Sequence, residues 1–166
     1  LGGATIRPGE QAQPDLDRAR QLYRELLEMG ADDPRLQTEA LRRLGDMEME
    51  LGDALRGEVP GAGAGSAETR AAIELYTRLL EGHPDYDRAD LVLYQLARAW
   101  EAEGEPERAL ARLDQLVTRF PGSVHYVEAQ FRRGEILFSA QRWRDSEVAY
   151  AAVISAGSGT EFFDQA

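Results

Sequence analysis

The side chains best suited to metal binding or proton transfer are the two histidines, His83 and His125. A metal site or a general base needs other polar side chains that converge on the same point. Neither histidine has a pair of carboxylates at the spacing that one face of a helix would bring to it. Both fall at turns between predicted helices, and we interpret them as turn or surface residues.

Acidic pairs are the second candidates for acid–base chemistry. Glu48 with Glu50, and Asp32 with Asp33, are close in the sequence. We interpret both pairs as solvated faces or as charges at helix ends. No order of Ser, His and Asp suggests a nucleophilic triad. The sequence therefore predicts no catalytic activity, no metal and no cofactor.

A Gly-rich stretch from Gly52 to Ser66 contains the run Pro60–Gly65. A loop that cradles phosphate would end in Gly-Lys-Ser or Gly-Lys-Thr, and this one does not. We favour a tolerated surface insertion with the composition of a flexible linker. A loop that binds a partner is the alternative.

Composition limits the class of protein. The chain has 166 residues, of which 43% are hydrophobic and 30% charged, as in one globular domain. Its net charge of −11 argues against a nucleic-acid partner, because phosphate attracts basic surfaces. No apolar run approaches the ~20 residues that cross a bilayer. Without cysteine, disulfides and thiolate metal sites are excluded, which fits an oxidising compartment. Because the first residue is Leu1, we expect a fragment that lacks its N-terminus.

A repeat of 37 residues runs through most of the chain. It is defined by small residues and by large residues that recur at the same spacing. The small positions in the second helix of each pair are Ala72, Ala109 and Ser146, followed four residues later by Tyr76, Leu113 and Tyr150. The small positions in the first helix of each pair are Gly45, Ala97 and Gly134. Small residues allow two helices to approach closely, so the repeat predicts stacked helix pairs.

The pattern predicts about seven helices, each of which would be marginal alone and must stack on its neighbours. Ser66 is the expected N-cap of the third helix, and Pro106 suits the first turn of the fifth. The expected ranges are 15–29, 35–51, 67–81, 87–103, 105–119, 124–140 and 142–156.

These residues resemble the tetratricopeptide repeat (TPR), in which Leu-Gly lies on helix A, Ala-x3-aromatic lies on helix B, and Pro follows. The resemblance implies an all-α, right-handed superhelix of antiparallel helix pairs. Residues 1–14 would be an N-terminal extension. Residues 15–166 would be the repeat domain: helix B of a first repeat, repeats two to four, the start of a fifth, and an insert at 52–66. The repeat exceeds the usual 34 residues by three, in the turns after Pro84 and Pro121.

One turn and the helix after it point to a smaller group of TPR proteins. The turn is Phe120-Pro121-Gly122-Ser123, and the helix carries Glu128-Ala129-x-Phe131-x-x-Gly134-Glu135. Together they are similar to TPR domains of bacterial cell-envelope proteins. Examples are Tol–Pal-associated periplasmic proteins, the TPR lipoprotein of outer-membrane assembly, and TPR proteins described as TonB-system components. This resemblance implies the periplasm or cell envelope, and the cytoplasm is the alternative.

The resemblance also implies where a partner would bind, because the A helices of this fold line its concave side. Tyr94 and Phe131 have the alternative of packing between neighbouring A helices. Arg133 stands where the family has Leu; we favour a snorkelling side chain over one that grips a ligand. The expected concave residues are Arg42, Asp46, Met49, Tyr94, Arg98, Glu101, Phe131, Glu135 and Phe138.

The expected function is a non-catalytic scaffold that binds a peptide or partner domain in this groove. One alternative is a structural module that packs within a larger TPR protein. Another is a cytosolic adaptor. Family members that grip acidic chaperone tails use Lys, Arg and Asn, whereas this chain has no Lys or Asn and carries Asp46 and Glu135 at aligned positions.

Overall fold

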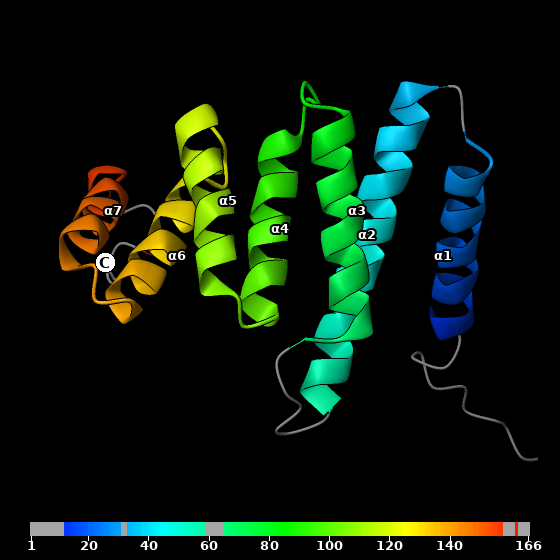
Figure 1. Ribbon diagram of the computed structural model, residues 1–166, viewed down its shortest axis with the longest axis horizontal. Coiled ribbons are helices and arrows are strands. Elements are labelled where there is room, and N and C mark those ends of the chain that lie inside the picture. The colour runs from blue at the N-terminus through cyan, green and yellow to red at the C-terminus, as the bar shows by residue number, and fades with distance from the viewer. Residues whose placement is uncertain (1–11, 31–32, 59–64, 158–161, 163–166) are drawn as a thin grey trace, which may run out of the picture.

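The computed structural model describes residues 12–30, 33–58, 65–157 and 162, and every regular element in these ranges is a helix (Figure 1). The predicted all-α fold with about seven helices is therefore confirmed. Residues 1–11 of the extension predicted at 1–14, the Gly-rich residues 59–64 and most of the expected fifth repeat lie outside the described residues. Residues 12–14 of that extension belong to the first helix instead. The helices are α1 (Ala12–Glu28), α2 (Pro34–Glu58), α3 (Ala67–Gly82), α4 (Ala89–Ala102), α5 (Pro106–Arg119), α6 (Tyr126–Ser139) and α7 (Trp143–Ser155).

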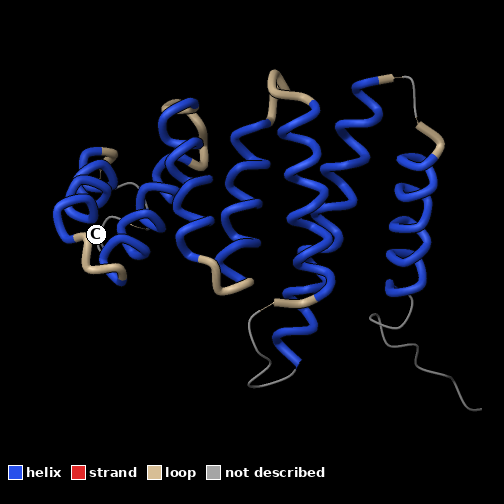
Figure 2. Tube along the Cα trace, viewed as in Figure 1, coloured by secondary structure: helices blue, strands red, loops and turns tan. Residues whose placement is uncertain are grey.

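The helices stand side by side in chain order, from α1 at one end to α7 at the other (Figures 1 and 2). The most extensive contacts are within the pairs α2–α3, α4–α5 and α6–α7, and the remaining ones join each pair to the next. This is the helix-pair architecture expected from the 37-residue period, in which each pair buries its apolar surface against its neighbours.

The starts of α3 and α5 follow the local sequence signals. The Ser66 hydroxyl oxygen accepts a hydrogen bond of 3.0 Å from the Thr69 backbone N–H, which confirms Ser66 as the N-cap of α3. Pro106 lies in the first turn of α5, where its missing N–H costs no hydrogen bond.

The prediction that the second helix ends at Leu51 is wrong, because α2 continues to Glu58. Gly52 is buried in this extension, and a Cβ there would lie 2.7 Å from Thr69 Oγ1. Close packing against the start of α3 thus extends the helix through residues whose composition suggested a loop. After residues 59–64 the chain returns at Gly65, whose φ of +84° suits glycine and whose N–H donates to the Ala102 carbonyl oxygen at 3.1 Å.

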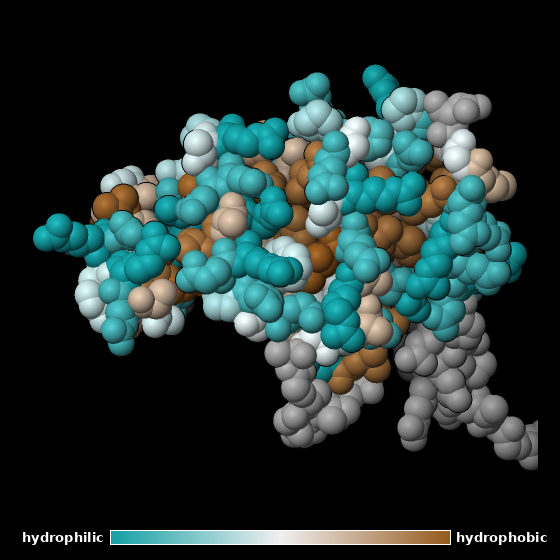
Figure 3. All heavy atoms as spheres, in the orientation of Figure 1, coloured by the Kyte–Doolittle hydropathy of each residue, from teal (hydrophilic) through white to brown (hydrophobic). Residues whose placement is uncertain are grey.

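The core runs along the row of helices in two adjoining apolar clusters. On the face drawn in Figure 3, hydrophobic residues fill the spaces between helices, and hydrophilic side chains frame them. All six small positions of the repeat are buried: Gly45, Ala72, Ala97, Ala109, Gly134 and Ser146. Between α6 and α7 the approach is close enough for the Ser146 hydroxyl to donate to the Gly134 carbonyl oxygen at 3.0 Å.

One acidic residue departs from expectation. Glu48, interpreted as part of a solvated face, is 1% exposed. Its carboxylate accepts from Arg20 Nη2 at 2.6 Å and from Arg24 Nη2 at 2.5 Å, and both arginines belong to α1. Burial of the charge is compensated by the two guanidinium groups, which fasten α1 to α2. Glu50 is exposed as expected.

Candidate partner-binding face

The side chains expected to meet a partner come from the A helices α2, α4 and α6. We call the surface predicted there the A-helix face; it comprises Arg42, Asp46, Met49, Tyr94, Arg98, Glu101, Phe131, Glu135 and Phe138. On α2, Arg42 is only 4% exposed. Its guanidinium donates to Glu39 and to Asp46, each at 2.5 Å. The guanidinium of Arg42, which was expected to face a partner, is thus buried and paired with Asp46 and Glu39.

Asp46 also accepts a hydrogen bond of 2.8 Å from the hydroxyl of Tyr76, a fully buried residue of α3. The ring passes beside Gly45, where a Cβ would lie 2.6 Å from Tyr76 Cε1. Burial, together with the charge and hydrogen bond of Asp46, raises the pKa of Tyr76 far above its usual range. A tyrosine from the B helix thereby holds an acid of the A-helix face.

The same arrangement recurs in the last repeat. Tyr150 of α7 packs against Gly134, where a Cβ would lie 2.4 Å from its Cε1, and its hydroxyl donates to Glu135. In the middle repeat, Ala97 and Leu113 occupy the matching positions, and the next residue is Arg98. The two helix pairs that have glycine at the small position also have the tyrosine and the acid, and the pair with alanine has neither. Sequence reasoning missed this link, although the same three kinds of residue stand at matching positions in the first and last helix pairs.

Tyr94 of α4 was expected on the concave side but is 7% exposed, which supports the alternative that it packs between A helices. Its ring stacks on His125, with centroids 4.8 Å apart and planes at 8°, and its hydroxyl donates to Glu128. Burial and the hydrogen bond to Glu128 raise the pKa of Tyr94 to about 12. His125 therefore covers Tyr94.

Ion pairs join the A helices to one another. Arg98 of α4 lies 3.3 Å from Asp53 of α2. Arg132 of α6 lies 3.0 Å from Glu101 of α4 and 3.0 Å from Glu128 on its own helix. Burial raises the pKa of Glu101, and the charge of Arg132 opposes that shift. Arg132 was not among the predicted residues, although its place four residues after Glu128, on the same face of the helix, could have indicated it.

Phe131 and Glu135 lie together on α6. The Phe131 ring is half-buried, tilted against Tyr150 at 6.1 Å, and stacked on Phe162 at 5.2 Å between centroids. His125 follows Tyr94 by 31 residues and Phe162 follows Phe131 by 31, so the two ring stacks are equivalent in the repeat. Glu135 is exposed.

Phe138 lies at the C-terminal end of α6, 55% exposed, with its ring edge-on to Trp143 at 4.9 Å. Met49 corrects the prediction: it is 4% exposed and packs in the core, so it is not presented to a partner. Arg133 has a partly buried side chain whose guanidinium lies 2.6 Å from Asp114 of α5, which agrees with the favoured interpretation.

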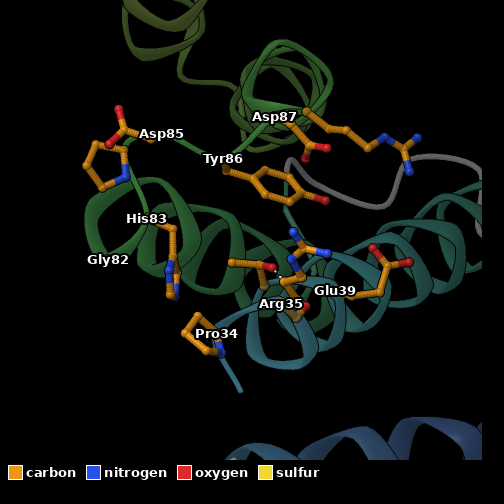
Figure 4. Close-up of a pocket in the computed structure, with 11 residues that line it drawn as sticks. Pro34, Arg35, Glu39, Gly82, His83, Asp85, Tyr86 and Asp87 are labelled. Atoms are coloured by element: carbon orange, nitrogen blue, oxygen red, sulfur yellow. Dashed lines mark hydrogen bonds between the residues drawn. The ribbon is translucent and has the colours of Figure 1, made fainter. Parts of the chain in front are cut away.

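Several hollows adjoin these helices, and two of them combine aromatic side chains with charged residues of the A helices. One, of about 320 Å³, lies on the A-helix face and is lined by Glu101, Glu128, Phe131, Arg132, Glu135 and Phe162. A larger one, of about 750 Å³, lies between the start of α2 and the turn from α3 to α4 (Figure 4). There Tyr86 lies across the hollow from Glu39 and Pro34, and His83 and Arg35 add further polar groups.

The described residues hold neither a metal site of clustered ligands nor a helix that could span a membrane. Within them, no group of three or more His, Cys, Asp or Glu side chains is placed to hold a metal ion. Over the same ranges, no helix combines the length and apolar character needed to span a bilayer.

Comparison with known proteins supports the repeat assignment. The family model described as "Tetratricopeptide repeat" matches residues 65–131. No curated protein matches the chain significantly. Among solved structures, the chain is similar to the one described as "Crystal structure of MamA", with 16% identity, a TM-score of 0.48, and coverage of 90% of this chain and 94% of that one. Residues 65–131 therefore match the tetratricopeptide repeat, and they lie within an array of helix pairs.

Proposed function

We propose that this chain is a non-catalytic protein-binding scaffold of the bacterial cell envelope, and that its A-helix face holds a peptide or a partner domain. The observation that carries the proposal is the row of charged and aromatic side chains on α4 and α6. Arg98, Glu101, Phe131 and Glu135 stand on successive repeats and are held by contacts between helices. Side chains fixed before binding lose little entropy when a partner arrives.

Site-specific crosslinking tests this proposal. A photoreactive phenylalanine analogue would replace Arg98 on the A-helix face, or Arg144 on α7 as a control, in the full-length protein inside its own host. Arg98 is half-buried beside Asp53, whereas Arg144 is exposed. We expect a defined crosslinked partner from position 98, identified by mass spectrometry, and none from position 144.

Binding of the purified partner then gives the quantitative test. The double variant Arg98→Ala/Glu135→Ala should lower its affinity by tenfold or more, the scale of a binding hot spot. Arg144→Ala/Glu147→Ala removes the same two charges from exposed positions on α7 and should change affinity less than twofold. Equal affinity of both variants, with folding intact, would show that the partner binds elsewhere.

The envelope location rests on the turn sequence Phe120-Pro121-Gly122-Ser123 and on the absence of cysteine. Immunodetection of the full-length protein in periplasmic, membrane and cytoplasmic fractions of its host tests it. Recovery in the cytoplasmic fraction alone would favour the adaptor alternative instead.

A second candidate is a structural module that packs against another part of a larger chain. The observation that favours it is the pair Phe138 and Trp143, 55% and 54% exposed at one end of the helix row. Large aromatic rings left in water at the end of a repeat array are typical of a surface covered by a neighbour. In the full-length protein, slower exchange of α6 and α7 amides than in this chain alone would support it.

A further inference from the structure

We propose that the hollow between α4, α6 and Phe162 receives the lysine or arginine side chain of a basic partner segment. This inference rests on the proposed function and names the chemistry of the partner. The hollow of about 320 Å³ is large enough for one long side chain, and it lies where the A-helix face joins two repeats.

Aromatic rings form the apolar part of this hollow. Phe131 and Phe162 stack with centroids 5.2 Å apart and planes at 27°. Rings of this kind can pack against the methylene groups of a lysine or arginine, and their π faces attract its charged end. An aliphatic side chain would also fit the rings but would offer no positive charge to the surrounding carboxylates.

The charges around the hollow favour a cation. The hollow is lined by three carboxylates, those of Glu101, Glu128 and Glu135, and by one guanidinium, that of Arg132. Arg132 is paired with Glu101 and Glu128, each at 3.0 Å. Glu135 accepts from the Tyr150 hydroxyl, and no cation of the described residues forms an ion pair with it. An incoming ammonium or guanidinium would therefore bind Glu135 without displacing an existing partner.

An acidic partner fits poorly, because the cations of this face are already engaged. Arg132 lies between two carboxylates and stands 5.6 Å from the centre of the Tyr94 ring. Arg98 is paired with Asp53 at 3.3 Å, and Arg42 with Glu39 and Asp46. The net charge of −11 also steers basic segments towards the chain.

Fluorescence anisotropy with two labelled peptides tests the inference. The probe is a dodecapeptide of four Gly-Ser-Lys units, and the comparison peptide has four Gly-Ser-Glu units. We expect the lysine peptide to bind more weakly as salt rises, because exposed charges are screened. The glutamate peptide should not bind. Glu135→Gln and Phe162→Ala should each raise the Kd of the lysine peptide about fivefold.

Glu147→Gln is the matched control, since it removes the same charge from an exposed position on α7, and it should change the Kd less than twofold. Circular dichroism melting verifies that each variant is folded. Equal effects of Glu135→Gln and Glu147→Gln would mean that only overall charge attracts the peptide, and would overturn the inference. So would tighter binding of the glutamate peptide. In either case, if the double variant Arg98→Ala/Glu135→Ala still lowers the affinity of the crosslinked partner tenfold, the proposed function stands, and only the inference that the partner segment is basic fails.

Discussion

The hydroxyl of Tyr76 on α3 reaches past Gly45 to donate a hydrogen bond of 2.8 Å to Asp46 on α2. The contact connects a fully buried ring with a carboxylate of the A-helix face. It makes the packing inside a helix pair responsible for the position of a surface charge.

Replacing Tyr76 by Phe keeps the ring and removes this hydrogen bond. Because its acceptor is charged, we expect a loss of about 1.5–3 kcal/mol in the free energy of unfolding, measured by urea denaturation. Tyr150→Phe removes the equivalent bond to Glu135, which is exposed, and should cost less. A larger loss at Tyr150 would contradict the role of burial.

The pairing of Gly45 with Tyr76 predicts a coupling between the two positions. Gly45→Ala alone places a Cβ 2.6 Å from the buried ring and should destabilise the fold by about 1 kcal/mol or more, although Ala favours the helix. In the presence of Tyr76→Leu, which recreates the Ala97–Leu113 pairing, the same change should be neutral or favourable. A double-mutant cycle measures the difference, and additive effects would refute the coupling.

Ala109 on α5 is fully buried at the small position of the middle repeat. Ala109→Leu should cost about 1–3 kcal/mol, because the added atoms have no free space. Thermal and urea unfolding measure the loss. Ala111→Leu, at an exposed position on the same helix, is the control and should be nearly neutral. Equal stability of both variants would show that the repeat alignment is wrong there.

The ion pairs of Glu48 predict how firmly α1 is held against α2. Glu48→Gln removes a buried carboxylate that accepts from Arg20 and Arg24, so α1 should open more often. We expect amide exchange in residues 15–28 to quicken at least tenfold, while α4 to α6 stay unchanged. Glu50→Gln, exposed on the same helix, is the control. Unchanged exchange in α1 would mean that apolar contacts alone hold it.

The buried tyrosines predict a loss of stability in alkali. Folding raises the pKa of Tyr94 to about 12 from its ordinary value of 10.0. The folded state therefore keeps a proton that the unfolded state releases, so this contribution is complete below pH 10 and is lost as pH rises through about 12. Urea denaturation should show falling stability over that interval, with a shallower fall in Tyr94→Phe. An identical slope in that variant would contradict the assignment.

The period of 37 residues was enough to predict the helix pairs and their close contacts, because buried small residues such as Ala72 and Ala109 must recur in every repeat. It was not enough to predict where α2 ends. Gly52 has the composition of a loop, yet its missing side chain is what lets α2 pass close to Thr69. A glycine that permits close packing and a glycine that ends a helix look alike in one sequence.

The A-helix face was harder to predict than the fold. The family pattern identifies which side of a helix faces inward, but the next repeat decides what remains exposed there. The His125 ring stacks on Tyr94, and Met49 is buried in the core. The hydrogen bond from Tyr150 to Glu135 depends on a ring crossing between helices, which spacing along the chain does not show.

The main contacts of each helix are with the helices before and after it in the chain. Under tension such an array has no distant strand or disulfide to break first, because the described residues contain neither. A force applied to its two ends would unfold the array in steps, because each helix pair is held only by its neighbours. The chain would then act as an extensible tether, a mechanical property set by the order of its contacts.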